Sequence, residues 1–213
     1  MVLFLTSSPT GNLDGSYLVE GLDNRNGFVD RLRPHWKLGA RCLIISAFPD
    51  NDAANDEMRS FFRMAVLKSG FTISAFDLWD NRTTDFSKER LHSYDVVFLG
   101  GGHVPTQRAF FERIGLRESF AGFAGIVIGI SAGSMNAAEE VYSVPEEAGE
   151  ATNPKYVKFF LGLKLTRIKI LPHYQMVKGY YKDGIPLYPV IVKNDSMGHE
   201  FISIEDGAYV YEH

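Results

Sequence analysis

One short segment of the chain has the residue types and spacing of a nucleophilic catalytic turn. Gly129-Ile130-Ser131-Ala132-Gly133 matches the pattern Gly-x-Ser-x-Gly. In this pattern a sharp strand-to-helix turn holds the serine in a strained conformation, and the flanking glycines remove side chains that would clash. An apolar strand-like run precedes the segment and small residues follow it, as the pattern requires. We therefore predict that Ser131 is a nucleophile; the alternative is a purely structural turn where a helix packs closely on a strand.

A serine hydroxyl needs a base that takes its proton at neutral pH, and histidine is the usual one. The chain has six histidines. In open α/β sheets, catalytic groups gather beyond the carboxyl ends of the strands, which favours His103 and His173. His173 follows a predicted strand downstream of the serine and is the predicted base. The alternative is a loop histidine that hydrogen-bonds to backbone.

A third group, usually a carboxylate, must orient the base. The glutamates between Ser131 and His173 are Glu139, Glu140, Glu146, Glu147 and Glu150. The first two fall on the predicted helix after the serine, where they could equally form a solvated face. Glu146 and Glu147 fall in the next loop, which could fold back over the strand ends. The spacing alone does not choose among them.

A run of three glycines, Gly100-Gly101-Gly102, follows another predicted strand. Backbone N–H groups without a neighbouring Cβ suit an oxyanion hole. The run lacks the Lys-Ser/Thr of a P-loop and the spacing of a dinucleotide-binding loop. We expect the N–H groups of Gly102 and Ala132 to bind an oxyanion together, unless the glycines only form a turn.

The elements that must position these residues alternate along the chain. Short apolar runs alternate with longer amphipathic stretches, a pattern typical of parallel βαβ units. One helix has apolar residues at helical spacing and ends before Gly70. The predicted helices are Asn26–Trp36, Asp52–Lys68, one beginning near Pro105 and one near Ala132. The predicted strands are Val2–Leu5, Arg41–Phe48, Phe71–Leu78, Asp95–Leu99, Gly125–Ile130, Lys164–Leu171, Pro189–Val192, Glu200–Ile204 and Ala208–Tyr211, with turns at Asn194-Asp195 and Asp206-Gly207.

Composition limits the classes of function. Apolar residues make up 45% of the 213 residues, enough for one core, and we expect residues 1–213 to form a single domain. The net charge of −4 provides no field that would gather nucleic acid or an anionic membrane. The N-terminal residues lack the pattern of a signal peptide, so we expect a cytoplasmic protein. The only cysteine, Cys42, lies in an apolar run and reads as core.

Three spaced blocks together resemble a known family. Val97-Phe98-Leu99-Gly100-Gly101-Gly102, Ile128-Gly129-Ile130-Ser131-Ala132-Gly133-Ser134 and Leu171-Pro172-His173-Tyr174 are similar to the peptidase E (aspartyl dipeptidase) family of serine peptidases, whose relatives include cyanophycinase. The resemblance implies a three-layer α/β fold with a mostly parallel sheet, flavodoxin-like and class I glutamine amidotransferase-like. It also implies a cytoplasmic hydrolase that uses neither a metal nor another cofactor.

The resemblance assigns roles to particular residues. Ser131 matches the nucleophile, His173 the base and Glu146 the acid, while Gly101, Gly102, His103 and Ala132 match oxyanion and substrate positions. The family often has Asn where this chain has His103. Aspartyl specificity in the family depends on a basic residue, usually Arg, beyond the catalytic histidine. Between Tyr174 and Pro189 the chain has no arginine, and only Lys178 and Lys182 could receive an acidic side chain.

We therefore expect a serine peptidase of short peptides, with Asp-X dipeptides among the candidate substrates and a Ser-His-Glu triad. The expected partner is a short peptide substrate, with neither nucleic acid nor membrane, and the expected state is a monomer or a homodimer. The alternatives are an esterase of the α/β-hydrolase type and a non-catalytic ligand-binding protein on the same scaffold. A glutamine amidotransferase is excluded, because that reaction needs a cysteine at the position of Ser131.

Overall fold

The computed structural model describes residues 1–10 and 20–213. Its centre is a six-stranded sheet with the order β12-β1-β5-β4-β2-β3. Five neighbouring strands run parallel, and only β12 is antiparallel to its neighbour β1. The strands of this sheet are β1 (Val2–Thr6), β2 (Ala40–Ile45), β3 (Ile73–Trp79), β4 (Val96–Leu99), β5 (Ile126–Ile130) and β12 (Tyr209–Glu212).

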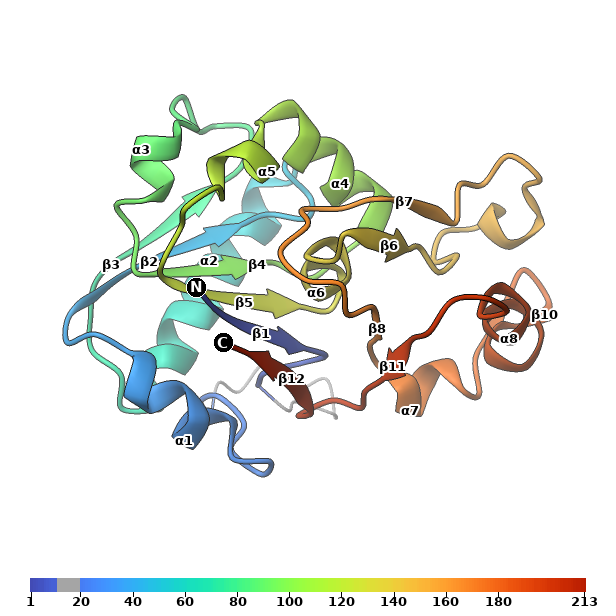
Figure 1. The fold of residues 1–213 in the computed structure, drawn as a ribbon, viewed down its shortest axis with the longest axis horizontal. Helices are drawn as coiled ribbons and strands as arrows, with labels where there is room; N and C mark the ends of the chain where they lie inside the picture. Colours follow the sequence, from blue (N-terminus) through green and yellow to red (C-terminus); the bar gives the residue numbers. More distant parts are fainter. Residues whose placement is uncertain (11–19) are drawn as a thin grey trace.

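Helices cover both faces of the sheet, so the molecule has three layers (Figure 1). Side chains alternate along each strand: Leu3 and Leu5 of β1 belong to one core, and Val2 and Phe4 to the other. One face packs against α1 (Phe28–Leu32) and α2 (Asp52–Lys68). The other packs against α3 (Lys88–Leu91), α4 (Val104–Arg113), α5 (Leu116–Ser119) and α6 (Ala132–Asn136). A short 3-10 helix, η1 (Arg33–His35), follows α1.

The sequence explains why these elements form. All five residues of β5, Ile-Val-Ile-Gly-Ile, are buried, as expected of a parallel strand covered on both faces. Helix α2 begins after Asn51, whose side chain accepts a hydrogen bond from the N–H of Ala54. It buries Phe62, Ala65 and Val66 on one side.

The segment 140–203 extends beyond the carboxyl ends of the parallel strands, where the arrows of β1, β4 and β5 point in Figure 1. It consists of small two-stranded sheets and short helices. These elements lie at this one end of the central sheet. They are β6 (Glu140–Tyr142), η2 (Glu150–Thr152), β7 (Phe159–Leu161), β8 (Ile170–Leu171), α7 (Tyr174–Val177), β9 (Tyr181–Lys182), β10 (Ile185–Pro186), η3 (Leu187–Val192), α8 (Lys193–Asp195) and β11 (Ile202–Ser203).

The predicted α/β class and mostly parallel sheet are confirmed. Three predicted strands are wrong or too long. Only Ile202 and Ser203 of the predicted Glu200–Ile204 strand are in a strand. Only Ile170 and Leu171 of the predicted Lys164–Leu171 strand are in a strand. Lys164 has a left-handed φ of 61° at the start of the run, and the Thr166 hydroxyl accepts a hydrogen bond from the N–H of Ile168, which turns the chain locally. The segment Pro189–Val192 lies in the helical turns of η3, since a short apolar run fits a buried helix as well as a strand. In the part of the chain that the structure describes, no helix is long and apolar enough to cross a membrane.

Candidate active site

An open cleft of about 500 Å³ lies over the carboxyl ends of four adjacent strands. Its floor is formed by residues that directly follow or end these strands, and the chain beyond the sheet supplies its opposite wall. The floor residues are Ser7 and Ser8 after β1, Phe48 after β2, Gly101, Gly102 and His103 after β4, and Ile130 and Ser131 at β5; the wall residues are Glu146, Glu147 and His173. The cleft therefore lies where open α/β sheets bind ligands.

Ser131 is held in a strained turn between β5 and α6. Its backbone has φ 49° and ψ −112°, a region that residues with a side chain rarely adopt. Both flanking glycines are required by their surroundings: a Cβ at Gly129 would lie 2.6 Å from the Cα of Ser134, and a Cβ at Gly133 would lie 2.1 Å from the carbonyl oxygen of Leu99. These contacts allow the sharp turn that presents the Ser131 hydroxyl to the cleft.

The Ser131 hydroxyl lies within hydrogen-bond distance of His173. The Oγ of Ser131 is 2.9 Å from the Nε2 of His173. On the other side of the ring, Nδ1 lies 2.7 Å from the Oδ1 of Asp206. The geometry joins a hydroxyl, an imidazole and a carboxylate in one line, the arrangement in which the carboxylate fixes the tautomer that leaves Nε2 free to accept the serine proton.

Asp206 is held by more than the histidine. The Ser7 hydroxyl donates to Oδ1 at 2.5 Å, and the Gln175 side chain donates to Oδ2 at 2.5 Å. Burial alone would raise the pKa of the Asp206 carboxyl, but the hydrogen bonds from His173, Ser7 and Gln175 outweigh it and hold the pKa below its ordinary value. Asp206 is therefore ionised at neutral pH.

Ser7 also fixes the backbone of His173. The His173 N–H donates to the Ser7 Oγ at 2.8 Å, and His173 has a left-handed φ of 54°. This conformation starts helix α7 immediately after strand β8. Ser7 thus connects the end of β1 to both the base and the carboxylate.

The prediction that Glu146 orients the base is corrected by this geometry. The Nδ1 of His173 faces Asp206, and among the described residues none hydrogen-bonds to the Glu146 carboxyl. The reason is topological: the antiparallel pairing of β12 with β1 brings the turn before β12 next to Ser7. Glu146 instead lines the wall of the cleft that faces the strand ends.

Glu139 and Glu140 have partners outside the cleft. Glu139 pairs with Lys164 at 3.0 Å, and Glu140 pairs with Lys169 and His199. Neither lines the cleft, and both form ion pairs, in agreement with the solvated alternative considered from the sequence.

Glu146 is nevertheless unusual. Glu146 is exposed as a residue, but the protein atoms around its carboxyl desolvate that group and raise its pKa to about 7, against the opposing attraction of His103 and His173. Its backbone oxygen accepts a hydrogen bond from the Nζ of Lys182 at 2.5 Å. Glu146 is therefore a partly protonated group at neutral pH on the wall of the cleft.

Backbone N–H groups without a protein acceptor lie beside Ser131. Among the described residues, none accepts a hydrogen bond from the N–H of Gly101, Gly102 or Ala132. A Cβ at Gly102 would lie 2.4 Å from the ring of Phe48, so only glycine fits there. These free donors match the requirement of an oxyanion hole.

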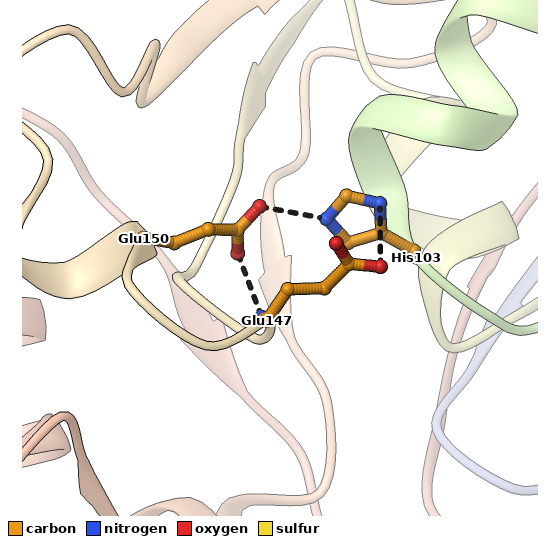
Figure 2. Close-up of side chains that lie close together, drawn as sticks. All are labelled: His103, Glu147 and Glu150. Atoms are coloured by element: carbon orange, nitrogen blue, oxygen red, sulfur yellow. Dashed lines mark hydrogen bonds and ion pairs between the residues drawn. The ribbon is translucent and has the colours of Figure 1, made fainter.

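His103 fastens the acidic loop to the start of α4 (Figure 2). Its Nε2 lies 3.0 Å from Glu150 Oε1, its Nδ1 lies 2.7 Å from the Thr106 hydroxyl, and Glu147 lies 3.8 Å from Nδ1. The second Glu150 oxygen accepts the N–H groups of Glu146 and Glu147.

The His103, Glu147 and Glu150 ligand atoms lie within 4.8 Å of one another, close enough for a metal to be considered. However, Glu147 faces Nδ1 of the ring and Glu150 faces Nε2, whereas one metal ion can bind only one of the two ring nitrogens. The cluster is better described as a network that holds the loop.

The two lysines considered for an acidic substrate lie elsewhere. Lys182 binds the backbone oxygen of Glu146, and Lys178 lies 4.0 Å from Glu205. Among the residues that the structure describes, no lysine or arginine lines the cleft.

The sequence did not identify Ser7, Gln175 or Asp206 as site residues. Ser7 follows the first strand directly, and strand ends were the criterion that selected the histidines. Asp206 was recognised only as part of a turn with Gly207. The signal available was its position just before the last strand of the sheet.

Comparisons with known proteins agree with this description. The model of Peptidase family S51 matches residues 46–212. A peptidase from an acI-B1 Actinobacterium superposes with a TM-score of 0.64 at 15% identity, covering 100% of this chain and 83% of that one. A provisionally named peptidase E protein from Listeria monocytogenes EGD-e superposes with a TM-score of 0.55 at 14% identity, covering 100% and 98%. No curated protein matches the sequence. At these identities the two structures show a shared fold.

Proposed function

The chain belongs to peptidase family S51 and is a serine-type peptidase, and we propose that it hydrolyses short peptides with Ser131 as nucleophile, His173 as base and Asp206 as orienting acid. The observation that carries the proposal is the continuous contact from Ser131 through His173 to Asp206. This triad replaces the Ser-His-Glu triad expected with Glu146.

The distances support a proton path for acyl transfer. Ser131 Oγ attacks the scissile carbonyl while Nε2 of His173 takes its proton, and the charge that develops on the ring faces the Asp206 carboxylate. His173 then gives the proton to the leaving amine, so the peptide C–N bond breaks and an acyl-enzyme remains. Water then attacks the ester while the same ring takes its proton. The bond between the acyl carbon and Ser131 Oγ breaks, the ring returns the proton to Oγ, and the acid product leaves.

We propose that the N–H groups of Gly102 and Ala132 bind the oxyanion, with Gly101 beside them. Their freedom from protein acceptors supports this role. Removing one such donor costs serine hydrolases about 2.7–4 kcal/mol of transition-state stabilisation.

We do not restrict the proposal to Asp-X dipeptides. An acidic substrate side chain would need a cation, whereas the cleft wall carries two carboxylic residues, Glu146 and Glu147. The cytoplasmic location and the monomeric or homodimeric state expected from the sequence stay predictions.

The chain order also argues against the esterase alternative. An α/β-hydrolase presents its triad in the order serine, acid, histidine, whereas here the order is Ser131, His173, Asp206. A parallel screen of ester and peptide substrates tests this distinction.

The test is labelling with a fluorophosphonate probe together with hydrolysis of a dipeptide library. We expect a stable adduct on Ser131 and release of free amino acids, both lost in Ser131→Ala. Labelling that persists in Ser131→Ala would refute the assignment of the nucleophile. Labelling without hydrolysis of any peptide would refute the peptidase proposal.

A further inference from the structure

A second cavity adjoins the catalytic cleft on the far side of His173. It has a volume of about 180 Å³. His173 and Glu146 line both the cleft and this cavity, while Ser131 and the glycines line only the cleft. The cavity therefore lies next to the site where the proposed reaction occurs, with His173 and Glu146 between them.

Almost all of the cavity wall is apolar. The wall residues other than His173 and Glu146 are Met135, Val144, Pro145, Leu171, Pro172, Met176, Val177, Tyr180 and Leu187. Met135, Val144, Leu171 and Leu187 are buried, whereas Met176 and Tyr180 are 60% and 55% exposed. The cavity thus has an interior formed by the core and a rim of apolar side chains that water contacts.

Size and chemistry indicate what would fill it. A dry apolar cavity of about 150 Å³ accepts a benzene ring, so this one has room for a branched aliphatic or an aromatic side chain. Burying such a side chain is favourable in proportion to the apolar area removed from water. Among the described residues no lysine or arginine lines the cavity. An acidic side chain would find Glu146 there, and the His173 ring is already engaged by Ser131 and Asp206.

The position relative to His173 indicates which part of the substrate reaches it. In the proposed mechanism His173 gives its proton to the leaving amine, so the residue that carries this amine passes against the imidazole. The oxyanion donors and Ser131 contact the acyl side, and they do not line the cavity.

We propose that this cavity is a binding site for an apolar side chain of the substrate, on the leaving-group side of the scissile bond. The proposal rests on the proposed function and names its substrate class: short peptides with an aliphatic or aromatic residue immediately after the cleaved bond. Glu146 stands at the boundary between the two spaces and disfavours an acidic residue there.

The experiment compares two dipeptide series, Ala-Xaa and Xaa-Ala, with Xaa as Leu, Phe, Gly or Asp. We measure kcat/KM by quantifying the released amino acids. The expected result is at least a tenfold preference for Leu or Phe over Gly in the Ala-Xaa series, with Asp the poorest. Equal rates across Ala-Xaa, or an apolar preference confined to Xaa-Ala, would overturn the proposal.

Variants connect any preference to the cavity. Val177→Trp fills the cavity. It should reduce the ratio of kcat/KM for Ala-Leu to kcat/KM for Ala-Gly (the Leu/Gly ratio) to about the value expected if the substrate side chain lay on an open surface. The matched control, Val157→Trp, places the same bulk at a residue that is 61% exposed and does not line the cavity, and it should keep the wild-type ratio. A ratio that Val177→Trp leaves intact would overturn the assignment.

Met176→Ser provides a second route should the tryptophan prevent folding, which thermal unfolding reports. Met176 is on the exposed rim, and its replacement should lower the same Leu/Gly ratio; an unchanged ratio counts against the proposal. Fluorophosphonate labelling of the wild-type protein separates the two failures. If the protein neither labels nor cleaves peptides, the proposed function fails and this inference with it. If it labels and cleaves without the preference, the inference alone fails.

Discussion

Replacing Asp206 by Asn tests the proposed triad most directly. In the structure Oδ1 accepts from Ser7 while lying 2.7 Å from Nδ1 of His173, and Oδ2 accepts from Gln175 at 2.5 Å. An asparagine offers one acceptor oxygen instead of two. With its oxygen toward His173, its amide faces the amide donor of Gln175. With the amide turned toward His173, Nδ1 must accept, so the proton moves to Nε2 and the base for Ser131 is lost.

The expected magnitude follows from charge and tautomer. Two opposite charges about 4 Å apart attract by about 4 kcal/mol at an effective dielectric of about 20, which is about 10³ in rate. The Asp206 side chain is 8% exposed and that of His173 is 30% exposed, so solvent screens part of this attraction, as an effective dielectric of about 20 already assumes. With the tautomer added, we expect Asp206→Asn to lower the rate about 10⁴-fold, the loss typical of this substitution in serine proteases.

The assay is the second-order rate of fluorophosphonate labelling at Ser131, which needs an activated serine but no peptide side chain. Glu139→Gln removes the same charge at a surface ion pair with Lys164 and serves as the matched control. The labelling rate of Glu146→Gln should be at least a hundred times that of Asp206→Asn. A larger loss in Glu146→Gln, or near-normal labelling in a folded Asp206→Asn protein, would refute the proposed acid.

Three further outcomes are expected. Gly133→Ala places a Cβ against the Leu99 carbonyl oxygen, 2.1 Å away, and should lower the free energy of unfolding by at least about 3 kcal/mol, roughly 6–12 °C in Tm. The control Gly179→Ala meets open space and should shift Tm little. Similar Tm values for the two variants would contradict the packing argument. Because the pKa of Glu146 is raised to about 7, its ionisation lowers the stability of the wild type as pH rises from its unfolded pKa through about 7. The Tm of Glu146→Gln minus that of the wild type should therefore be larger at pH 8 than at pH 5. The same difference at both pH values would refute the raised pKa. Cys42 is fully buried, and burial raises the pKa of its thiol, so an aromatic disulfide reagent should react only after denaturation; fast labelling of the native protein would contradict this.

Local patterns predicted the parts of the site that local structure creates. Ser131 and the glycines around it form a strand-to-helix turn that has no room for a Cβ at the flanking positions. Because this requirement falls on residues adjacent in sequence, the sequence pattern identifies them. His173 could be selected because it follows a strand. The fold class followed from alternating strands and helices in the same way.

The orienting acid could not be predicted because it depends on a contact between distant segments. Asp206 meets His173 only because β12 pairs with β1, at the opposite end of the chain. The spacing of the glutamates did not choose among them, and Glu146 was assigned only through the family resemblance. Its side chain does reach the cleft, but from the wall and without a hydrogen bond to the base among the described residues.

The pairing of β12 with β1 also sets an order of events. Chains are synthesised from the N-terminus, and segments begin to fold as they emerge. Strands β1 to β5 can assemble around the serine turn early, yet Asp206 enters the site only when Tyr209–Glu212 docks alongside Val2–Thr6. A nascent or partly refolded chain therefore carries its nucleophile before it can activate it. Peptide-cleaving activity should appear last in refolding, after the bulk of the sheet has formed, which keeps an incompletely folded hydrolase inactive.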